Sequence, residues 1–422
     1  MEYFNLKRPE ERVSFAEAAR RGLGSDQGLF HPMAIPRLDA SAVLDMSRFD
    51  RYRTLLEPFV APDFSGTTID EMVAAAFTFD SPTVPVGDAY ALELFHGPTL
   101  AFKDYGARFM AQCLARIRGD GPMTILTATS GDTGAAVAHA FKDAPGIRVV
   151  VLYPQGRISH AQEQLFCTLG GNIETLAVHG SFDDCQALVK TAFDNQALSS
   201  RLGLNSANSI NVSRLVAQIL YFWDLCAAVR TENLVVSVPS GNFGDLTAGL
   251  MAKSMGAPIA RFVAATNVND TVPRYLQTGT WEPRPTVSTA SNAMDVSRPN
   301  NWPRVEYLLS DNGWTLDARV VDEADTVAAI RSLDALGYTG EPHCAVAYKA
   351  LRRSLRPGET GAFLCTAHPA KFAESVESAL GRKLPVPAAI AEALGKKNLS
   401  AEMEPDARAF KEYLLSSWKR EK

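Results

Sequence analysis

Residues 123–153 read MTILTATSGDTGAAVAHAFKDAPGIRVVVLY, and this stretch decides the fold class. Residues 123–128 and 147–153 are apolar and rich in β-branched side chains, whereas residues 134–142 between them have the spacing of an amphipathic helix. A strand, a helix and a second strand at this spacing predict a βαβ unit and therefore parallel strands. Because the strands are almost continuously apolar, both faces of the sheet should be covered.

The same alternation continues along the chain. Further strands are expected at residues 172–178, 233–238 and 261–266, and helices at residues 159–169, 182–197 and 245–255. The expected fold class is therefore α/β with a mostly parallel sheet. In such folds ligands bind beyond the carboxyl ends of the strands, so the turns that follow the strands are where a site is expected.

The two ends of the chain have a different character. Apolar residues at helical spacing in residues 14–21 and 69–77 predict a small helical unit at residues 1–85, and the turn-rich residues 80–88 indicate a linker. Residues 86–380 form the expected core, and residues 381–422 indicate an exposed helix with a frayed end. A length of 422 residues agrees with about three folding units.

Composition excludes several functional classes. With 42 Lys and Arg against 47 Asp and Glu, the net charge of −5 argues against nucleic acid as a main partner. Neither a membrane-spanning segment nor a secretory signal is evident, and no obligate protein partner is indicated. Six cysteines without a CxxC pair favour reduced thiols in the cytoplasm, and seven dispersed histidines without HExxH give no support for a metal site.

Two glycine-containing turns could bind anions. In residues 127–134 (TATSGDTG), a helix N-terminus follows hydroxyl side chains and a carboxylate, although ordinary helix capping explains the same residues. In residues 238–245 (VPSGNFGD), a glycine-rich loop between a strand and a helix could hold a phosphate. That loop is neither a Walker A nor a GxGxxG motif, so a single phosphate is a simpler occupant than a dinucleotide. A tight capped loop is the alternative.

Lys103 is the candidate reactive amine. It follows Leu100, Ala101 and Phe102, which would remove water from the amine, and it precedes a helix expected at residues 105–117. Desolvation and the positive end of the helix both disfavour the charged amine, so its pKa should be lowered, as suits a lysine that forms a Schiff base. A solvated surface amine is the alternative.

Two further features complete the pattern. Residues 204–214 (LNSANSINVSR) carry amide and hydroxyl side chains that lead to Arg214, and they could hold a second anion or form an ordinary polar loop. Thr366 follows the apolar run at residues 362–364 and would offer a hydroxyl at a strand end. A reactive lysine with a single-phosphate loop is what pyridoxal phosphate needs, since it is an aldehyde that bears one phosphate.

Several segments closely resemble those of threonine synthases of the longer form, and they occur in the same order from residue 1 to about residue 380. They are FHGPTLAFKDYGARFMAQ from residue 95, TATSGDTGAAVAHAF from 127, LFCTLGGNIETLAV from 165, GLNSANSINVSR from 203, VPSGNFGDLTAG from 238, ATNVNDTVPR from 265, SNAMDVSRPNNWPR from 291 and TAHPAKF from 366. The last 40 residues carry no recognised motif.

The resemblance implies a fold type II enzyme, similar to the tryptophan synthase β-subunit, with pyridoxal 5′-phosphate between two α/β subdomains, the smaller at roughly residues 104–200. It implies conversion of O-phospho-L-homoserine and water into L-threonine and phosphate. Lys103 would bind the cofactor covalently and act as the catalytic base, and Thr366 would face the pyridine nitrogen. The remaining cofactor contacts would come from Gly241, Asn242, Phe243, Gly244 and Asp245 at the phosphate, and from Asp132 near the 3′-oxygen, where shorter relatives have Asn.

The resemblance also implies two substrate contacts. Thr129, Ser130 and Thr133 would hold the carboxylate, and Asn205, Ser206 and Arg214 would hold the phosphate. Two alternatives stay open on the same scaffold. One is another reaction, that of a hydroxyamino-acid dehydratase or a β-replacing synthase, and the other is a non-catalytic protein that binds phosphorylated ligands.

Overall fold

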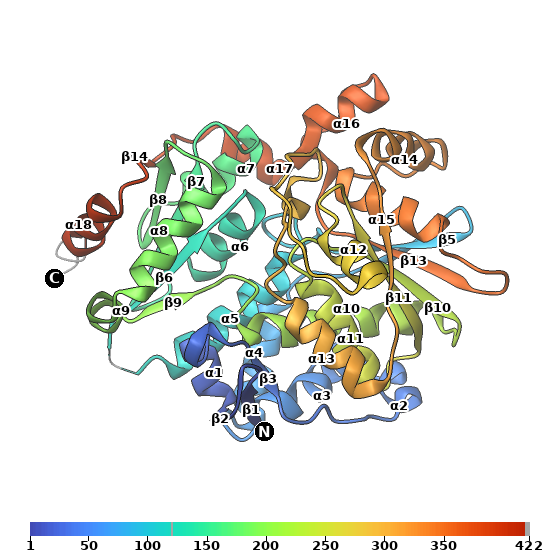
Figure 1. Ribbon diagram of the computed structural model, residues 1–422, viewed down its shortest axis with the longest axis horizontal. Helices are drawn as coiled ribbons and strands as arrows, with labels where there is room; N and C mark the ends of the chain where they lie inside the picture. Colours follow the sequence, from blue (N-terminus) through green and yellow to red (C-terminus); the bar gives the residue numbers. More distant parts are fainter. Residues whose placement is uncertain (120, 418–422) are drawn as a thin grey trace.

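The computed structural model describes residues 1–119 and 121–417, and Figure 1 shows β-sheets surrounded by helices. Two sheets are parallel or nearly so and have helices around them, and a third, small sheet lies near the N-terminus. The expected α/β class is therefore confirmed. The chain forms part of the larger parallel sheet first, then most of the smaller one, then returns to the larger sheet.

The N-terminal unit combines a small antiparallel sheet with helices. Its strands lie in the order β2-β1-β3. Helices were expected at residues 14–21 and 69–77 and are confirmed, but the prediction of a purely helical unit is wrong. Strand β2 is mostly exposed and reads RPEERVS, so it lacks the apolar alternation that marks a strand. The elements are β1 (Glu2–Asn5), β2 (Arg8–Ser14), α1 (Phe15–Arg21), η1 (Ser25–Gln27), β3 (Phe30–Pro32), α2 (Ala40–Asp45), α3 (Arg48–Val60) and α4 (Gly66–Ala76).

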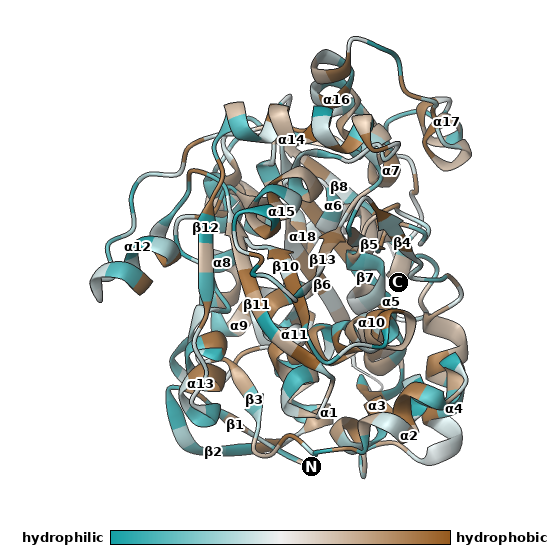
Figure 2. Cartoon of the chain, turned by 90° about the vertical axis from the view of Figure 1, so that its right-hand side faces the viewer, coloured by the Kyte–Doolittle hydropathy of each residue, from teal (hydrophilic) through white to brown (hydrophobic). Residues whose placement is uncertain are grey.

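The larger sheet has the strand order β12-β11-β10-β13-β5-β4, and its strands run parallel except for β4. Every residue of β10, LVVSVP, is buried, as expected for a parallel strand covered on both faces. Figure 2 shows β10 and β11 mostly in hydrophobic colours at the centre of the molecule. The strands are β4 (Thr83–Val86), β5 (Ala89–Glu93), β10 (Leu234–Pro239), β11 (Ile259–Thr266), β12 (Asp317–Val320) and β13 (Thr360–Cys365).

The linker expected at residues 80–88 is instead a hairpin. Strand β4 pairs antiparallel with β5, and the chain turns at Gly87, whose φ of 61° suits glycine. Pro85 is tolerated in this strand because β4 lies at the edge of the sheet, where one side of the backbone has no neighbouring strand. Proline and glycine suggested a linker, but here they mark an edge strand and its turn.

The smaller sheet has the strand order β14-β8-β7-β6-β9, and all its strands are parallel. The strands and helices expected between residues 123 and 197 are confirmed, with ends that differ by at most three residues. Helix α7 begins at Ser159, which forms a capping box with Gln162. The elements are β6 (Met123–Ala128), α6 (Asp132–Phe141), β7 (Ile147–Pro154), α7 (His160–Cys167), β8 (Ile173–Val178), α8 (Phe182–Asp194), α9 (Gln196–Leu202), β9 (Leu204–Ser206) and β14 (Ala401–Met403).

The described part of the C-terminal segment contains helices and is mostly exposed, as expected, but it is also docked onto the smaller sheet, which the sequence did not indicate. Strand β14 extends the smaller sheet beside β8, and α18 (Ala407–Ser417) packs against α8. Phe410 and Leu414, four residues apart on one face of α18, are buried in the core of that sheet. The other elements here are α16 (Ala373–Leu380) and α17 (Ala388–Leu394), and residues 418–422 lie outside the described residues.

The remaining helices cover the larger sheet and join it to the N-terminal unit. Helix α10 is long and apolar enough to cross a membrane by length and composition alone. However, 78% of it is buried in the protein, where it packs against α5 and α11, as a core helix does. These elements are α5 (Lys103–Ile117), α10 (Val212–Val229), α11 (Gly244–Ser254), α12 (Thr271–Thr278), η2 (Asn292–Met294), α13 (Trp302–Asn312), α14 (Glu323–Ala335), α15 (Pro342–Arg352) and η3 (Pro369–Phe372).

Candidate active site

A cavity of about 330 Å³ lies where the carboxyl ends of strands from the two parallel sheets meet. Strands β6 and β7 of the smaller sheet and β10 and β13 of the larger sheet each lead into a loop that lines it. This is the position at which open α/β sheets bind ligands. The predicted residues that line the cavity are Lys103, Thr129, Ser130, Thr133, Arg214, Gly241, Asn242, Phe243, Gly244, Asp245 and Thr366.

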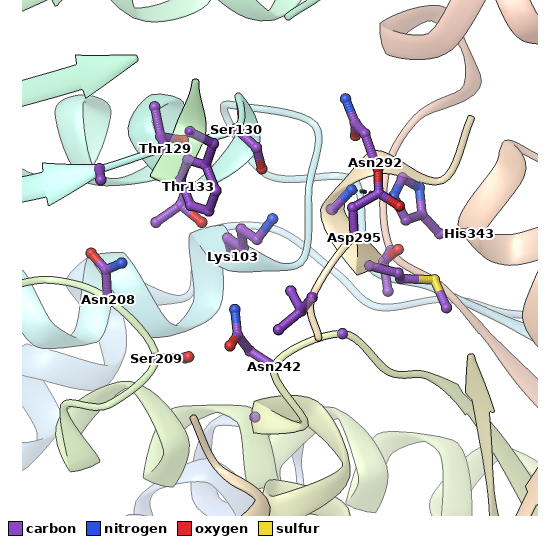
Figure 3. Close-up of a pocket in the computed structure, with 18 of the residues that line it drawn as sticks. Lys103, Thr129, Ser130, Thr133, Asn208, Ser209, Asn242, Asn292, Asp295 and His343 are labelled. Atoms are coloured by element: carbon purple, nitrogen blue, oxygen red, sulfur yellow. Dashed lines mark hydrogen bonds between the residues drawn. The ribbon is translucent and has the colours of Figure 1, made fainter. Parts of the chain in front are cut away.

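Lys103 lies at the centre of the residues labelled in Figure 3. Only 14% of its side chain is exposed. Burial lowers the pKa of Lys103, and the charges of Lys371 and Arg214 lower it further, while Asp132 and Asp245 act in the opposite direction. The predicted direction of the shift is confirmed, with burial as the largest cause. Such an amine is more readily neutral, and the neutral form is the nucleophile and the base.

The backbone around Lys103 is tightly fixed. Lys103 is the first residue of α5, and the carboxylate of the next residue, Asp104, accepts hydrogen bonds from the backbone N–H and the hydroxyl of Thr99 at 2.9 and 2.7 Å. Leu100 has a φ of 56°, a left-handed conformation that non-glycine residues rarely adopt. These constraints place the lysine backbone, so only the flexible side chain is free to move.

The glycine-rich loop at residues 240–244 has the features of a phosphate cradle. Phe243 adopts a left-handed conformation and precedes α11. This helix begins at the cavity, so its first N–H groups, which have no partner within the helix, are available there. A Cβ atom at Gly241 would lie 2.7 Å from the carbonyl oxygen of Ala293 and 2.8 Å from the Cα of Met294, so only glycine allows this close approach. A helix N-terminus with closely packed backbone is suited to one phosphate group.

Asp245, at the start of α11, is a buried carboxyl beside this loop. Tyr221 donates a short hydrogen bond to its Oδ1, whereas its Oδ2 has no hydrogen-bond partner in the part of the chain that the structure describes. Burial raises the pKa of Asp245 to about 8, although Lys103 and Arg214 act to lower it. Near pH 7 it is therefore mostly protonated, which removes a negative charge from the side of an anion site.

The turn after β6 is organised by Thr129. Its hydroxyl oxygen accepts hydrogen bonds from the N–H groups of Gly131 and Gly134 at 2.9 and 2.8 Å, so Thr129 shapes the turn from within. Ser130 and Thr133 line the cavity at the N-terminus of α6. Asp132 lies behind them, outside the lining, with its Oδ2 3.9 Å from the amine of Lys103.

Thr366 follows β13 and lines the cavity, as expected for a strand end. Its hydroxyl lies 3.5 Å from the buried carboxylate of Glu341. The same carboxylate accepts a hydrogen bond from His343 Nδ1 at 2.5 Å, and His343 Nε2 accepts one from the N–H of Ala293 at 3.1 Å. This chain of contacts joins the end of β13 to the loop that covers Gly241.

The polar loop at residues 204–214 is only partly a ligand site, and the prediction for two of its residues requires correction. Asn205 donates hydrogen bonds to the carbonyls of Ala19 and Arg20, at 3.1 and 2.8 Å, so its side chain faces α1 instead of the cavity. Ser206 accepts a hydrogen bond from the N–H of Asn208 and likewise does not line the cavity.

Arg214 does line the cavity, together with Asn208 and Ser209 from the same loop. Its Nη1 donates to the carbonyl of Ala207 at 2.8 Å, while its Nε has no partner among the described residues. Burial lowers the pKa of Arg214 to about 10, which still leaves it charged at neutral pH. An arginine with unused donors beside an amide and a hydroxyl can bind a second anion.

Sequence reasoning missed several residues of the site. Those that line the cavity are Arg157, Asn208, Ser209, Asn292, Asp295 and His343, and Lys371 lies behind it. Asp295 is held by Asn267, Asn269 and Thr289. Burial raises the pKa of Asp295 to about 6, although the hydrogen bonds from Thr289 and Asn267 act to lower it. Asn208, Ser209, Asn292, Asp295 and Lys371 lie in the segments quoted above for the resemblance, but nothing in the segments shows which side chains point inward.

Comparison with known protein families agrees with this geometry. Residues 83–366 match the model of the pyridoxal-phosphate-dependent enzymes, residues 2–77 that of the threonine synthase N-terminus, and residues 344–414 that of the threonine synthase C-terminal region. Over 99% of its length the chain is 55% identical to the whole threonine synthase of Escherichia coli. The chain belongs to the threonine synthase family. It is also 56% identical to the threonine synthase of Haemophilus influenzae, over 99% of this chain and all of that protein.

The solved structures give the same result. The crystal structure of Escherichia coli threonine synthase superposes with a TM-score of 0.95 and covers 99% of this chain and all of that one. Threonine synthase of Brucella melitensis with bound pyridoxal phosphate, at 30% identity and 98% coverage of both chains, gives a TM-score of 0.92. The fold type II class, the lyase class and the cofactor are therefore those of this family.

The family comparison also corrects the description of the C-terminus, because the C-terminal model extends to residue 414, into a segment in which no motif was recognised. More distantly related structures share part of this fold. A maize serine racemase and an O-ureido-L-serine synthase, both 18% identical, give TM-scores of 0.56 and 0.55. At this identity they show a shared fold alone.

Proposed function

We propose that this protein converts O-phospho-L-homoserine and water into L-threonine and phosphate, with pyridoxal 5′-phosphate bound at Lys103. One observation carries the proposal. A desolvated amine lines one cavity together with two sets of groups that suit anions, the loop at residues 240–244 and the cluster of Asn208, Ser209 and Arg214, which adjoin where Gly244 meets Ser209. A cofactor and a substrate that each carry a phosphate need two such sets.

The residues present fit the cofactor. The close packing at Gly241 and the N-terminus of α11 would hold its phosphate, and the hydroxyl of Thr366 would face the ring nitrogen. The protonated form of Asp245 would let this carboxyl lie beside the cradle without repelling an anion. When bound, pyridoxal phosphate supplies an electron sink that stabilises negative charge on the substrate carbons.

Lys103 would move the protons. Because burial favours the neutral amine, Lys103 can accept the proton from the substrate α-carbon and hold it within the cavity. Asp132, 3.9 Å from this amine, would stabilise the ammonium form after transfer. The fixed turn that begins α5 would keep the amine in place during these steps.

The substrate would be held at both ends. Ser130 and Thr133, at the N-terminus of α6, suit its carboxylate, because N–H groups and hydroxyls donate there. Asn208, Ser209 and Arg214 would bind its phosphate, and Arg157 at the same cavity offers a further guanidinium. Water must add only after phosphate has left, so the loop at residues 286–296, which lines the cavity, would exclude water earlier.

Dehydratases and β-replacing synthases use a similar scaffold but need no second phosphate site. The cluster around Arg214 therefore favours the reaction of a phosphorylated substrate. A cytoplasmic location also belongs to the proposal, and it rests on six cysteines that are all free thiols in the structure.

The test is to measure phosphate release from O-phospho-L-homoserine and threonine formation in the same reaction, using protein purified with pyridoxal phosphate. Equal amounts of both products are expected, with loss of both in Lys103→Ala and retention in Lys142→Ala, a partly exposed lysine outside the cavity. Phosphate with 2-oxobutyrate and no threonine would refute water addition. No mass change at the Lys103 peptide after borohydride reduction would refute the cofactor linkage.

A further inference from the structure

A second lysine lies buried behind the site. Lys371, in η3 after β13, has no exposed side-chain surface. Its amine donates a hydrogen bond to the carbonyl of Thr99 at 2.7 Å and forms an ion pair with Asp132 Oδ1 at 2.7 Å. Buried lysines are rare unless they are paired, and this one contacts two loops that also shape the surroundings of Lys103.

The carboxylate of Asp132 bridges the two lysines. Its Oδ1 meets Lys371 and accepts a hydrogen bond from Gln162 Nε2 at 3.0 Å, while its Oδ2 lies 3.9 Å from the amine of Lys103. Asp132 is the first residue of α6, where the N–H groups of the helix also favour a negative charge. The carboxylate therefore has a fixed place with one oxygen toward each amine.

Helix α7 holds both members of this pair. The hydroxyl of Ser159, which caps α7, donates to the carbonyl of Lys371 at 3.0 Å, and Gln162 in the same capping box holds Asp132. Gly131 has a φ of 130°, which L side chains rarely adopt, and a Cβ atom there would lie 2.6 Å from the end of the Gln162 side chain, so any other residue would disturb this contact. Residues from both parallel sheets thus meet at one ion pair beside the catalytic amine.

Charge explains why two partners are present. Burial raises the pKa of Asp132, but Lys371 and then Lys103 lower it more strongly, so it is ionised. A buried carboxylate alone beside Lys103 would strongly favour the protonated amine, and a protonated amine cannot accept a proton. The positive charge of Lys371 acts against that effect. Two other titratable groups act on Lys103: Arg214, which lowers its pKa, and Asp245, which raises it when ionised.

We propose that Lys371 and Asp132 form a fixed charge pair that positions Lys103 and balances its protonation, with Asp132 as the anionic partner and Lys371 as the counter-charge. Lys371 is thus a positioning residue that acts on the catalytic amine through Asp132. The proposal rests on the function proposed above, in which Lys103 binds the cofactor and moves the proton.

The test follows the absorption spectrum of the cofactor bound to the full-length enzyme as pH is varied. The midpoint of this titration reports the protonation of the bond between Lys103 and the cofactor. Removing a charge within about 6 Å shifts such a midpoint by about one pH unit or more. Lys371→Met should raise the midpoint, because a positive charge is lost, and Asp132→Asn should lower it.

Two further variants separate charge from structure. Lys371→Arg keeps the charge and should return the midpoint toward that of the wild type. The double variant Lys371→Met with Asp132→Asn removes both charges, so it should also titrate near the wild type, and it leaves no unpaired buried charge that would prevent folding. The acid limb of the pH profile of kcat should move in the same direction as the midpoint in each variant. Lys253→Met is the matched control, because Lys253 is half-buried on α11 without a carboxylate partner among the described residues, with its amine donating to the carbonyls of Ile259 and Ala260 and lying over the ring of Trp314.

Unchanged midpoints in both single variants, with only a lower Tm, would overturn the proposal and leave a purely structural ion pair. A lower midpoint in Lys371→Met would also overturn it, since Asp132 would then have taken up the proton itself. Failure of the proposed function is distinguishable, because the cofactor absorption band of the wild type would then persist in Lys103→Ala, which would show that the band does not come from a bond to Lys103.

Discussion

Gly241→Ala tests the cofactor cradle at its tightest point. An added Cβ atom would lie 2.7 Å from the carbonyl oxygen of Ala293 and 2.8 Å from the Cα of Met294. Both neighbours are backbone atoms, so no side-chain rotation can relieve the contact. Gly241 itself does not have a positive φ, so alanine adds crowding and little backbone strain. One strand-end loop must therefore move away from the other.

The size of the effect follows from this geometry. To reach ordinary van der Waals contact, the loops must separate by about 0.7 Å, and overpacking of this kind costs about 1–3 kcal/mol. If this cost falls on the cofactor-bound state, affinity for pyridoxal phosphate decreases about 5- to 150-fold. Titration of the cofactor-free protein with pyridoxal phosphate, followed by absorbance, measures the change in Kd.

Gly395→Ala is the matched control, because a Cβ atom there meets nothing closer than 3.6 Å and its φ is −80°. Its Kd should equal that of the wild type. Gly244→Ala, with its tightest contact at 3.3 Å to Ser209, should fall between the two. A Kd for Gly241→Ala within twofold of the wild type would refute the role of this contact in cofactor binding.

Three further predictions concern charge, the C-terminus and the polar loop. Burial raises the pKa of Asp245 from 3.8 to about 8, so the folded state binds this proton more tightly and loses stability as pH rises between these values. Asp245→Asn should therefore show a smaller fall in Tm from pH 5 to pH 8, and equal falls would contradict this. Phe410→Ala should lower the free energy of unfolding in urea by about 3–5 kcal/mol. The control Leu394→Ala, at an exposed residue, should lower it by roughly 0.5 kcal/mol. Equal losses in the two variants would contradict docking of α18. Asn205→Ala should lower Tm without changing KM, whereas Asn208→Ala should raise the KM for O-phospho-L-homoserine. The reverse pattern would place Asn205, and not Asn208, at the substrate.

The βαβ part of the fold was predictable because its signals are local. An apolar strand such as β6 and a capped helix such as α7 can be recognised within one window of sequence. Elements stabilised by distant partners were not predictable. Strand β2 is charged and exposed, and β14 is three residues long and pairs with β8, far earlier in the chain. Their conformation depends on neighbours that no local pattern describes.

The site shows the same division. The type of chemistry at each strand end was predictable from the sequence, because Lys103 and the loop at residues 240–244 lie in short motifs whose residue types suit a reactive amine and a phosphate. Which polar side chain points into the cavity could not be read. Asn205 lies in β9 with its side chain bonded to α1, whereas Asn208 lies in the loop after the strand, where no strand periodicity sets the direction of a side chain.

The charges of the whole site explain why it suits two phosphates. Lys371 is balanced by Asp132, Lys103 is pushed toward its neutral form by burial, and Asp245 is mostly protonated below pH 8. Among the described groups whose charges shift the pKa values of Lys103 and Asp245, Arg214 is then the cation without an ionised partner at neutral pH. Arg214, with Arg157 also in the lining, supplies positive charge that favours an anionic ligand, while Asp183 and Asp295 line the same cavity. Phosphates bring the compensating charge, so binding, and not folding alone, completes the electrostatics of the site.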